Sequence, residues 1–407
     1  MERPAMDGLD IAIGKALFKR AWVPAPSSTR GDDGLGPLFD ARSCASCHPA
    51  SGRAAARFDA LGHLEGRGVV LMIGQPDGAQ DPVYGRRLQI DAIPGLKAEG
   101  ILGARDTLLP DGRMTRKPQA STLSYGPLAA ESGLSLRVAP DLHGRGAMAA
   151  ISDETLLALE AEQARTPDEV RGKARRLIQP DGTVALGRFG WKAAHTDLRH
   201  QSAEAFFLDL GMSSPVFPAP WGDCTTAQPD CRAAPHGTRS HGPMADADDL
   251  EIPESVLSRV VAYVASLPVP RPTPALSEEE KQMRARGADL FTSTGCATCH
   301  QPTLPLSPDH DDGEARLFSD LLLHDMGPGL ASEMEEPGIT ASQWRTAPLA
   351  GLSHALVRQT GLLHDGRART VAEAILWHGG EASAARQTFE TLPPVDQAVL
   401  LAYVSSL

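Results

Sequence analysis

The chain has neither a long apolar run nor an excess of basic residues. No apolar stretch approaches the ~18 residues that suggest a membrane span. The 39 Lys and Arg residues stand against 51 Asp and Glu, so the net charge is −12, whereas nucleic-acid binders need a basic footprint. The start of the chain also lacks the pattern of a secretory leader. The composition, 42% hydrophobic and 22% charged, is that of an ordinary soluble globular protein.

Cysteine is scarce, and its few positions are informative. Four of the six cysteines lie in two copies of one pentad, within SCASCH at residues 43–48 and GCATCH at residues 295–300. The other two, Cys224 and Cys231, lie within the segment DCTTAQPDC. This loop either closes a disulfide between them or leaves two free thiols. Because disulfides belong to oxidising compartments, we expect an exported, periplasmic protein whose leader is absent from this chain.

The pentad CxxCH predicts covalent haem rather than zinc or a redox disulfide. Structural zinc takes about four N or S ligands, usually from two CxxC pairs at a defined spacing, and these pentads lie too far apart for that. A thioredoxin-type CxxC accompanies a βαβ pattern, and the chain shows none. In c-type attachment, two cysteine sulfurs bind the porphyrin and the adjacent His binds the iron. The predicted haem-binding residues are Cys44, Cys47, His48, Cys296, Cys299 and His300.

Each pentad lies within a repeated pair of helices. A segment GxxLF precedes each pentad, and a segment ending in AYVxSL follows it, as VVAYVASL at residues 260–267 and as LLAYVSSL at residues 400–407. This order is typical of class-I cytochrome c, in which the first and last helices cross at a small glycine. The predicted contacts are Gly14 and Phe18 with Tyr263, and Gly287 and Phe291 with Tyr403.

From this repeat we predict a mainly α fold of two class-I cytochrome c-like domains. The first spans residues 1–267 and contains a large insertion between its pentad and its closing helix. The second spans residues 275–407, after the stiff linker PVPRPTP. Ser277 and Glu280 form a capping-box pattern at its first helix.

The sixth ligand of each iron decides the function, because a haem with an open site reacts whereas one with two strong ligands transfers electrons. His378 ends a predicted helix that follows His364-Asp365-Gly366-Arg367. A histidine there either reaches an iron or is favoured by the helix dipole. Met326 is the alternative ligand for the C-terminal haem, and His63 and His143 are candidates for the N-terminal one.

Several stretches together resemble the di-haem oxidoreductase family, whose members carry a thiol oxidoreductase label. They are also similar to the bacterial di-haem cytochrome c peroxidases and the di-haem enzyme that matures methylamine dehydrogenase. These stretches are GDDGLGPLFDARSCASCH, DPVYGRRLQ, RFGWKAAHTDLRHQSAEAF, SDLLLHDMGPGLA, WRTAPLAGL and LLHDGRARTVAEAILWHGGEA. The resemblance places His378 at the distal position of the C-terminal haem. It therefore implies a bis-His, low-potential centre with His300.

The same resemblance implies that the N-terminal haem is the reactive one. Trp191 fits the position of a tryptophan between the haems, and Gln201 that of a glutamine near the reacting face. The general-acid glutamate of the peroxidases falls at Gly211, so the nearest carboxylate is Asp209. His195 or His200 is a candidate substitute. Arg345 and Arg367 either pair with haem propionates or lie on the surface.

We therefore predict an exported, peroxidase-like di-haem c-type cytochrome. It would hold two covalent haem c groups and pass electrons between a bis-His C-terminal haem and a reactive N-terminal haem. A small cytochrome or a cupredoxin is the expected redox partner, and peroxide, a protein or a metal is the expected substrate. One alternative is a pure electron-transfer cytochrome, and another is a redox partner in periplasmic iron or copper handling.

Overall fold

The computed structural model describes residues 7–28, 33–166, 170–238, 249–272, 274–275, 277–307 and 313–407. The α-helices within these residues are α1 (Gly8–Lys19), α2 (Cys44–Cys47), α3 (Arg145–Ala149), α4 (Asp153–Gln163), α5 (Leu198–Asp209), α6 (Pro229–Arg232), α7 (Glu254–Ala265), α8 (Glu278–Ser293), α9 (Leu352–Val357), α10 (Val371–Leu376), α11 (Ser383–Thr391) and α12 (Pro394–Ser405). Three 3₁₀ turns are η1 (Pro49–Ser51), η2 (Cys296–Thr298) and η3 (Gly380–Ala382). No helix in the described ranges is both long enough and apolar enough to span a membrane.

The described strands pair as two-stranded units. The pairs are β1 (Val23–Pro24) with β2 (Asp33–Leu35), β3 (Leu38–Phe39) with β7 (Asp91–Ala92), β4 (Arg57–Phe58) with β5 (Leu64–Glu65), β6 (Val69–Gly74) with β10 (Gly133–Val138), β8 (Ile101–Leu108) with β9 (Met114–Ser121), β11 (Arg176–Ile178) with β12 (Val184–Leu186), β13 (Leu304–Pro305) with β14 (Glu314–Ala315), and β15 (Leu323–Asp325) with β16 (Gln343–Arg345). All are antiparallel except β1–β2, which is parallel.

The prediction of a mainly α fold is wrong. The chain is 31% helix and 18% strand, spread over many small sheets, and it does not show two class-I cytochrome c-like domains. The cause lies largely in the segment between the first pentad and α7, which builds a separate β core. There β6 pairs with β10, and every second residue of β6, Val69, Leu71 and Ile73, is buried. Side chains alternate between the faces of a strand with a period of two, so these three fill one face.

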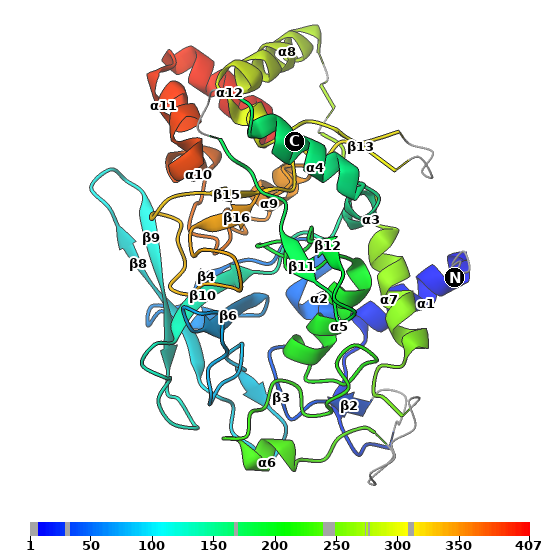
Figure 1. The fold of residues 1–407 in the computed structure, drawn as a ribbon. Helices are drawn as coiled ribbons and strands as arrows, with labels where there is room; N and C mark the ends of the chain where they lie inside the picture. Colours follow the sequence, from blue (N-terminus) through cyan, green and yellow to red (C-terminus); the bar gives the residue numbers. More distant parts are fainter. Residues whose placement is uncertain are drawn as a thin grey trace.

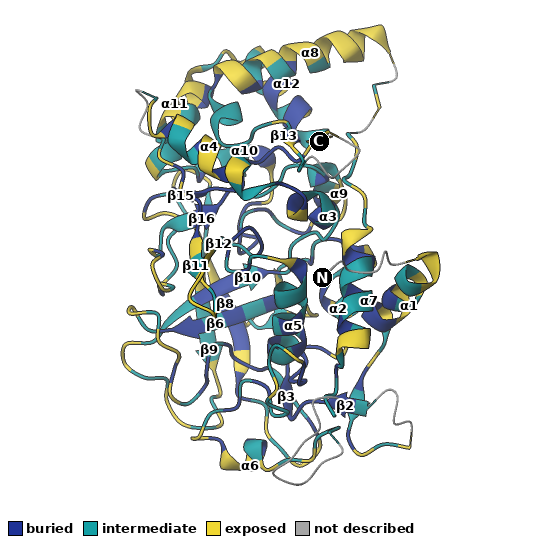
Figure 2. Cartoon of the chain, turned by 45° about the vertical axis from the view of Figure 1, so that its right-hand side comes forward, coloured by how far each residue is buried: buried dark blue, intermediate teal, exposed yellow. Residues whose placement is uncertain are grey.

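The two helix crossings that the repeat predicted are confirmed. Helix α1 crosses α7, and α8 crosses α12 (Figure 1). Phe18 meets Tyr263 edge-on with ring centroids 5.3 Å apart, and Phe291 meets Tyr403 edge-on at 5.7 Å. The capping box at Ser277 is also present and begins α8, whose outer face is exposed while its inner residues pack on α12 (Figure 2).

Gly14 allows the first crossing to be close, and this gives a testable expectation. A Cβ added at Gly14 lies 1.9 Å from the carbonyl oxygen of Arg259, whereas one added at Gly8 of the same helix meets nothing within 4 Å. Gly14→Ala gains about 1 kcal/mol of helix propensity but overpacks the crossing. We expect a net fall of about 1–3 kcal/mol in the free energy of unfolding. Urea denaturation with Gly8→Ala as the control measures it, and equal stability of the two variants contradicts the account.

The halves of the chain share one core. The largest cluster joins α1, α5 and α7 to residues that follow the second pentad, among them Leu304, Ala315 and Leu321. A second cluster lies among α8, α10 and α12 and contains Phe291, Trp377 and Tyr403. The residues around the two pentads are therefore held in one packed body.

Candidate functional site

Both pentads form a single helical turn. Helix α2 is the first pentad, capped by the Ser43 side chain, and the His48 amide donates to the Cys44 carbonyl at 2.9 Å. The second pentad follows Gly295, whose left-handed φ of 89° turns the chain into η2, and the His300 amide donates to the Cys296 carbonyl at 3.0 Å. Residues three and four apart share a helix face. Each turn therefore presents two sulfurs and one imidazole together.

Three histidines are oriented alike for metal binding. The Nδ1 atoms of His48, His300 and His378 each hydrogen-bond to a main-chain carbonyl, at 2.9, 3.1 and 2.8 Å. A carbonyl only accepts, so Nδ1 carries the proton and Nε2 is left with its lone pair. Burial lowers the pKa of His48 and of His300 to about 4, and it also lowers the pKa of His378. All three rings are therefore neutral, which is the form that binds a metal.

A cavity of about 600 Å³ opens beside the first pentad. Its wall includes Cys44, Cys47 and His48 on one side, with Phe18 from α1. Other lining residues come from β6, from β10, from the loop at 189–195 and from α5. The volume lies within the ~300–1,000 Å³ range of cofactor and ligand sites.

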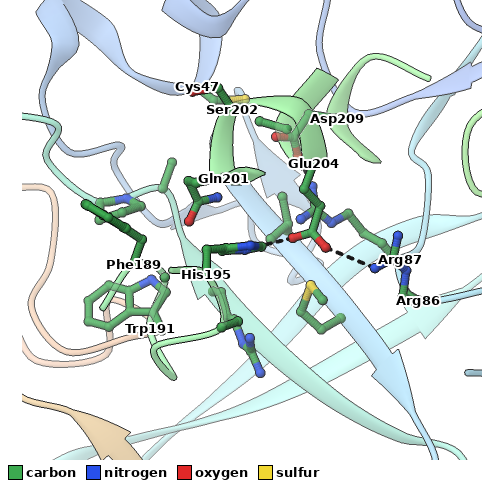
Figure 3. Close-up of a pocket in the computed structure, with 18 of the residues that line it drawn as sticks. Cys47, Arg86, Arg87, Phe189, Trp191, His195, Gln201, Ser202, Glu204 and Asp209 are labelled. Atoms are coloured by element: carbon green, nitrogen blue, oxygen red, sulfur yellow. Dashed lines mark hydrogen bonds and ion pairs between the residues drawn. The ribbon is translucent and has the colours of Figure 1, made fainter. Parts of the chain in front are cut away.

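A partly buried acid–base constellation around His195 lines this cavity (Figure 3). His195 donates from Nε2 to Oε2 of Glu204 at 3.0 Å, and its Nδ1 lies 2.8 Å from Nδ1 of His200. Arg86 donates to Oε1 of Glu204 at 2.9 Å. Burial alone would raise the pKa of Glu204, but His195 and Arg86 outweigh it and hold this pKa well below its usual range. Glu204 is therefore a carboxylate that faces a histidine.

Sequence reasoning missed Glu204 and chose Asp209 instead. Both line the cavity, but the side chain of Asp209 is held in an ion pair by Arg87. The search for the missing acid used the peroxidase spacing, which leads to Gly211. The signal that would have found Glu204 is helical periodicity, because α5 places a residue three positions after Gln201 on the same face.

Trp191 lies where the cavity meets the second hydrophobic cluster. It lines the cavity and also packs against the cluster around α8, α10 and α12. Its indole Nε1 donates to the Val138 carbonyl at 2.8 Å, and the guanidinium of Arg53 lies 5.4 Å from the ring centroid. Gln201 lines the cavity together with Trp191, so the structure brings together the tryptophan and the glutamine that the resemblance selected.

At the second pentad, two histidines face one another. The ring centroids of His300 and His378 are 6.4 Å apart. Two metal–nitrogen bonds of about 2 Å each fit between such rings. Met326, the alternative ligand, packs at the edge of the same cluster. The paired rings are the arrangement that a bis-His site requires.

The two candidates for the distal position of the first site lie elsewhere. His63 is half-buried and forms an isolated β-bridge with Gly103, and its Nδ1 is 3.7 Å from Asp59. His143 bonds to the side chain of Asp141 at 2.7 Å. Neither residue is part of the cavity wall. Besides His48, the histidine that lines the cavity is His195.

Three arginines around Trp191 have no carboxylate within ion-pair distance in the described part of the chain: Arg53, Arg145 and Arg345. Their guanidiniums donate only to main-chain carbonyls or to a methionine sulfur. Burial lowers the pKa of Arg345 to about 9. Arg367, by contrast, is committed to Asp365 at 2.7 Å, and neither Arg345 nor Arg367 lies on the surface. Buried guanidiniums without carboxylates are suited to an anionic group.

The remaining cysteines pair. The sulfurs of Cys224 and Cys231 lie at disulfide distance, with Cα atoms 6.2 Å apart, whereas the four pentad cysteines are free. Burial raises the pKa of Cys44 and of Cys47 to about 12. Neither pentad is therefore a redox disulfide in this structure.

Comparison with known proteins places these features in context. Residues 119–407 match the family described as "Di-haem oxidoreductase, putative peroxidase". The match includes the second pentad and begins after the first. No curated protein matches the chain.

The solved structures similar to this chain include a diheme peroxidase and a hydrazine synthase. The diheme peroxidase BthA from Burkholderia thailandensis is 15% identical with a TM-score of 0.43, over 100% of this chain and 87% of that one. Kuenenia stuttgartiensis hydrazine synthase is 16% identical with a TM-score of 0.26, over 70% of this chain and 98% of that one.

Proposed function

Because the chain belongs to the di-haem oxidoreductase family, we propose that it is an exported c-type cytochrome that reduces peroxide at its N-terminal haem. The observation that carries this proposal is the cavity at the first pentad. One wall holds Cys44, Cys47 and His48, and the remaining wall includes His195 and Glu204. The cavity therefore offers a haem attachment site and an acid–base pair in its walls.

Six residues would attach the two haems, namely Cys44, Cys47, His48, Cys296, Cys299 and His300. His378 would be the second axial ligand of the C-terminal haem. When bound, each haem supplies a redox-active iron whose behaviour depends on its axial ligands. The oriented, neutral histidines, the free thiols and the 6.4 Å ring separation support this assignment. Arg53, Arg145 and Arg345 would pair with the propionates, since guanidinium forks match carboxylates.

His195 and Glu204 would handle protons. Reduction of one hydrogen peroxide to two water molecules takes up two electrons and two protons. Nε2 of His195 donates to Glu204, and Nδ1 of His195 lies 2.8 Å from Nδ1 of His200, so this Nδ1 can accept a hydrogen bond from His200 whenever it carries no proton. A proton entering at half-buried His200 can therefore pass through His195 to the cavity. Gln201, on the same face of α5, would orient the substrate, and Asp209 would hold Arg87 in the wall.

Trp191 would carry electrons from the C-terminal haem to the N-terminal one. Its contacts with both the cavity and the second cluster support this role. The electrons would come from a reduced small redox protein, a cytochrome or a cupredoxin. The Cys224–Cys231 pair supports a periplasmic location, because disulfides persist in oxidising compartments. The haem-binding units would span residues 1–267 and 275–407.

Electron paramagnetic resonance of the oxidised, matured protein tests the proposal. We expect one low-spin ferric signal, from the haem between His300 and His378, and one high-spin or readily opened haem at His48. A spectrum with two low-spin signals, unchanged by added peroxide or cyanide, would instead indicate a pure electron carrier.

A further inference from the structure

A hairpin from the first half of the chain packs against α10, the short helix that precedes His378. Strands β8 and β9 form this hairpin, which extends along the molecule toward α10 (Figure 1). Leu109, which lies in the turn between β8 and β9, packs against the cluster around α10 and α12. Further along β9, Arg116 donates to the Asp365 carbonyl at 3.0 Å. The turn of the hairpin is therefore docked on the second haem-binding half.

Arg113 makes the most direct contact with the end of α10. Its Nη1 donates to the Leu376 carbonyl at 3.1 Å, and its guanidinium lies 4.5 Å from the ring centroid of Trp377. Asp111 accepts from Nε and Nη2 at 2.9 and 2.7 Å. Because Asp111 holds two of the guanidinium nitrogens, Nη1 is aimed at the helix. Arg113 thus satisfies one of the carbonyls that a helix end leaves free.

The other end of the helix is held as well. Glu373 accepts from the Met114 amide at 3.0 Å through Oε1 and from the Arg369 amide at 2.8 Å through Oε2. One carboxylate therefore ties the hairpin to the first turn of α10. With the contacts of Arg113, the hairpin holds this helix at both its first turn and its last.

Helix α10 needs such support because it has only six residues. Isolated helices of that length are not stable in water, and packing must hold them. His378 follows the C-cap residue Trp377, and its amide donates to the Ile375 carbonyl at 2.9 Å while its Nδ1 lies 2.8 Å from the Ala374 carbonyl. The position of the imidazole therefore depends on the last turn of α10, which Arg113 contacts.

We propose that Arg113 is a positioning residue for His378, so that the hairpin controls how firmly the sixth ligand binds the C-terminal haem. This inference rests on the proposed role of His378. A docked hairpin would hold His378 in place to bind that haem, and a loosened one would let His378 move away from it. In this way the β8–β9 hairpin, a segment of the first half of the chain, would affect the redox reactivity of the haem that the second half holds.

The test compares Arg113→Ala with Arg105→Ala in the matured di-haem protein. Arg105 lies on the same hairpin, is exposed and pairs in register with Lys117. Losing a charge-assisted hydrogen bond and a cation–π contact should raise the open fraction of the C-terminal haem about tenfold or more. Loss of its low-spin resonance and binding of carbon monoxide to the reduced haem measure this fraction. Arg105→Ala should match the unaltered protein.

Two further variants separate the possible outcomes. Arg113→Lys keeps the charge but not the planar fork, so we expect a smaller shift in the same direction; it also serves if Arg113→Ala does not fold. His378→Ala should lose the low-spin signal completely. If it does so while both Arg113 variants match the unaltered protein, the positioning role is refuted and the ligand assignment stands. If His378→Ala retains the low-spin signal, the ligand assignment itself fails.

Discussion

Replacing Glu204 with glutamine is expected to slow peroxide reduction by about 10²–10⁴-fold, the usual contribution of a positioned acid–base group. Glutamine has nearly the same shape and still accepts a hydrogen bond from Arg86, but it cannot carry the negative charge that holds His195 in its present tautomer. The variant should retain both haems with unchanged spin states. A change in turnover without a change in the resonance spectrum is therefore attributable to proton transfer.

Glu254→Gln is the matched control, because Glu254 forms an exposed ion pair with Arg199 on the outer side of α5. It should leave turnover unchanged. His195→Gln should lower turnover by a similar factor, and the double variant of His195 and Glu204 should be little worse than either single one, since residues that act as a unit are not additive. Turnover of Glu204→Gln within a few-fold of the unaltered protein would show that the carboxylate has no catalytic role.

Removing the cysteines of one pentad at a time is expected to abolish one haem signal at a time. With Cys44 and Cys47 replaced by alanine, the matured protein should carry one covalent haem, show only the low-spin spectrum and lose peroxide reduction. With Cys296 and Cys299 replaced, it should again carry one covalent haem but retain the high-spin spectrum. The reason is that each cysteine pair lies on the same helical turn as the histidine of its own site.

The two double variants serve as controls for one another, because each removes two thiols from the same kind of turn. Mass spectrometry counts the covalent haem additions, and paramagnetic resonance gives the spin state of the haem that remains. A low-spin spectrum from both variants contradicts the division into a reactive and an electron-transferring haem. Two covalent additions in either variant contradicts the attachment residues.

The features that the sequence predicted well are local or repeated ones. The capping box at Ser277 depends on four neighbouring residues, and a short-range pattern describes it directly. The approach of Gly14 to Tyr263 joins distant helices, and it was predicted from the repeated helix pair rather than from a local pattern. The fold class failed because the long segment after the first pentad was read as an insertion into a helical domain. Residues 69–73 read VVLMI, a continuous apolar run without polar alternation, and the partner strand β10 begins only at Gly133.

The candidate site was predicted in part for a similar reason. Trp191 and Gln201 came from a resemblance, and they line the same cavity as the first pentad. Glu204 was missed because family spacing replaced helical geometry. The contact between Arg113 and Trp377 joins residues far apart in the chain, and no short-range pattern describes such a contact.

The intact mass of the protein, purified after expression with c-type cytochrome maturation, tests the central claim most directly. Two thioether-linked haems per chain should appear as two covalent haem additions, resistant to denaturant and acid extraction. A chain that matures correctly yet carries one addition or none would contradict the account of both pentads.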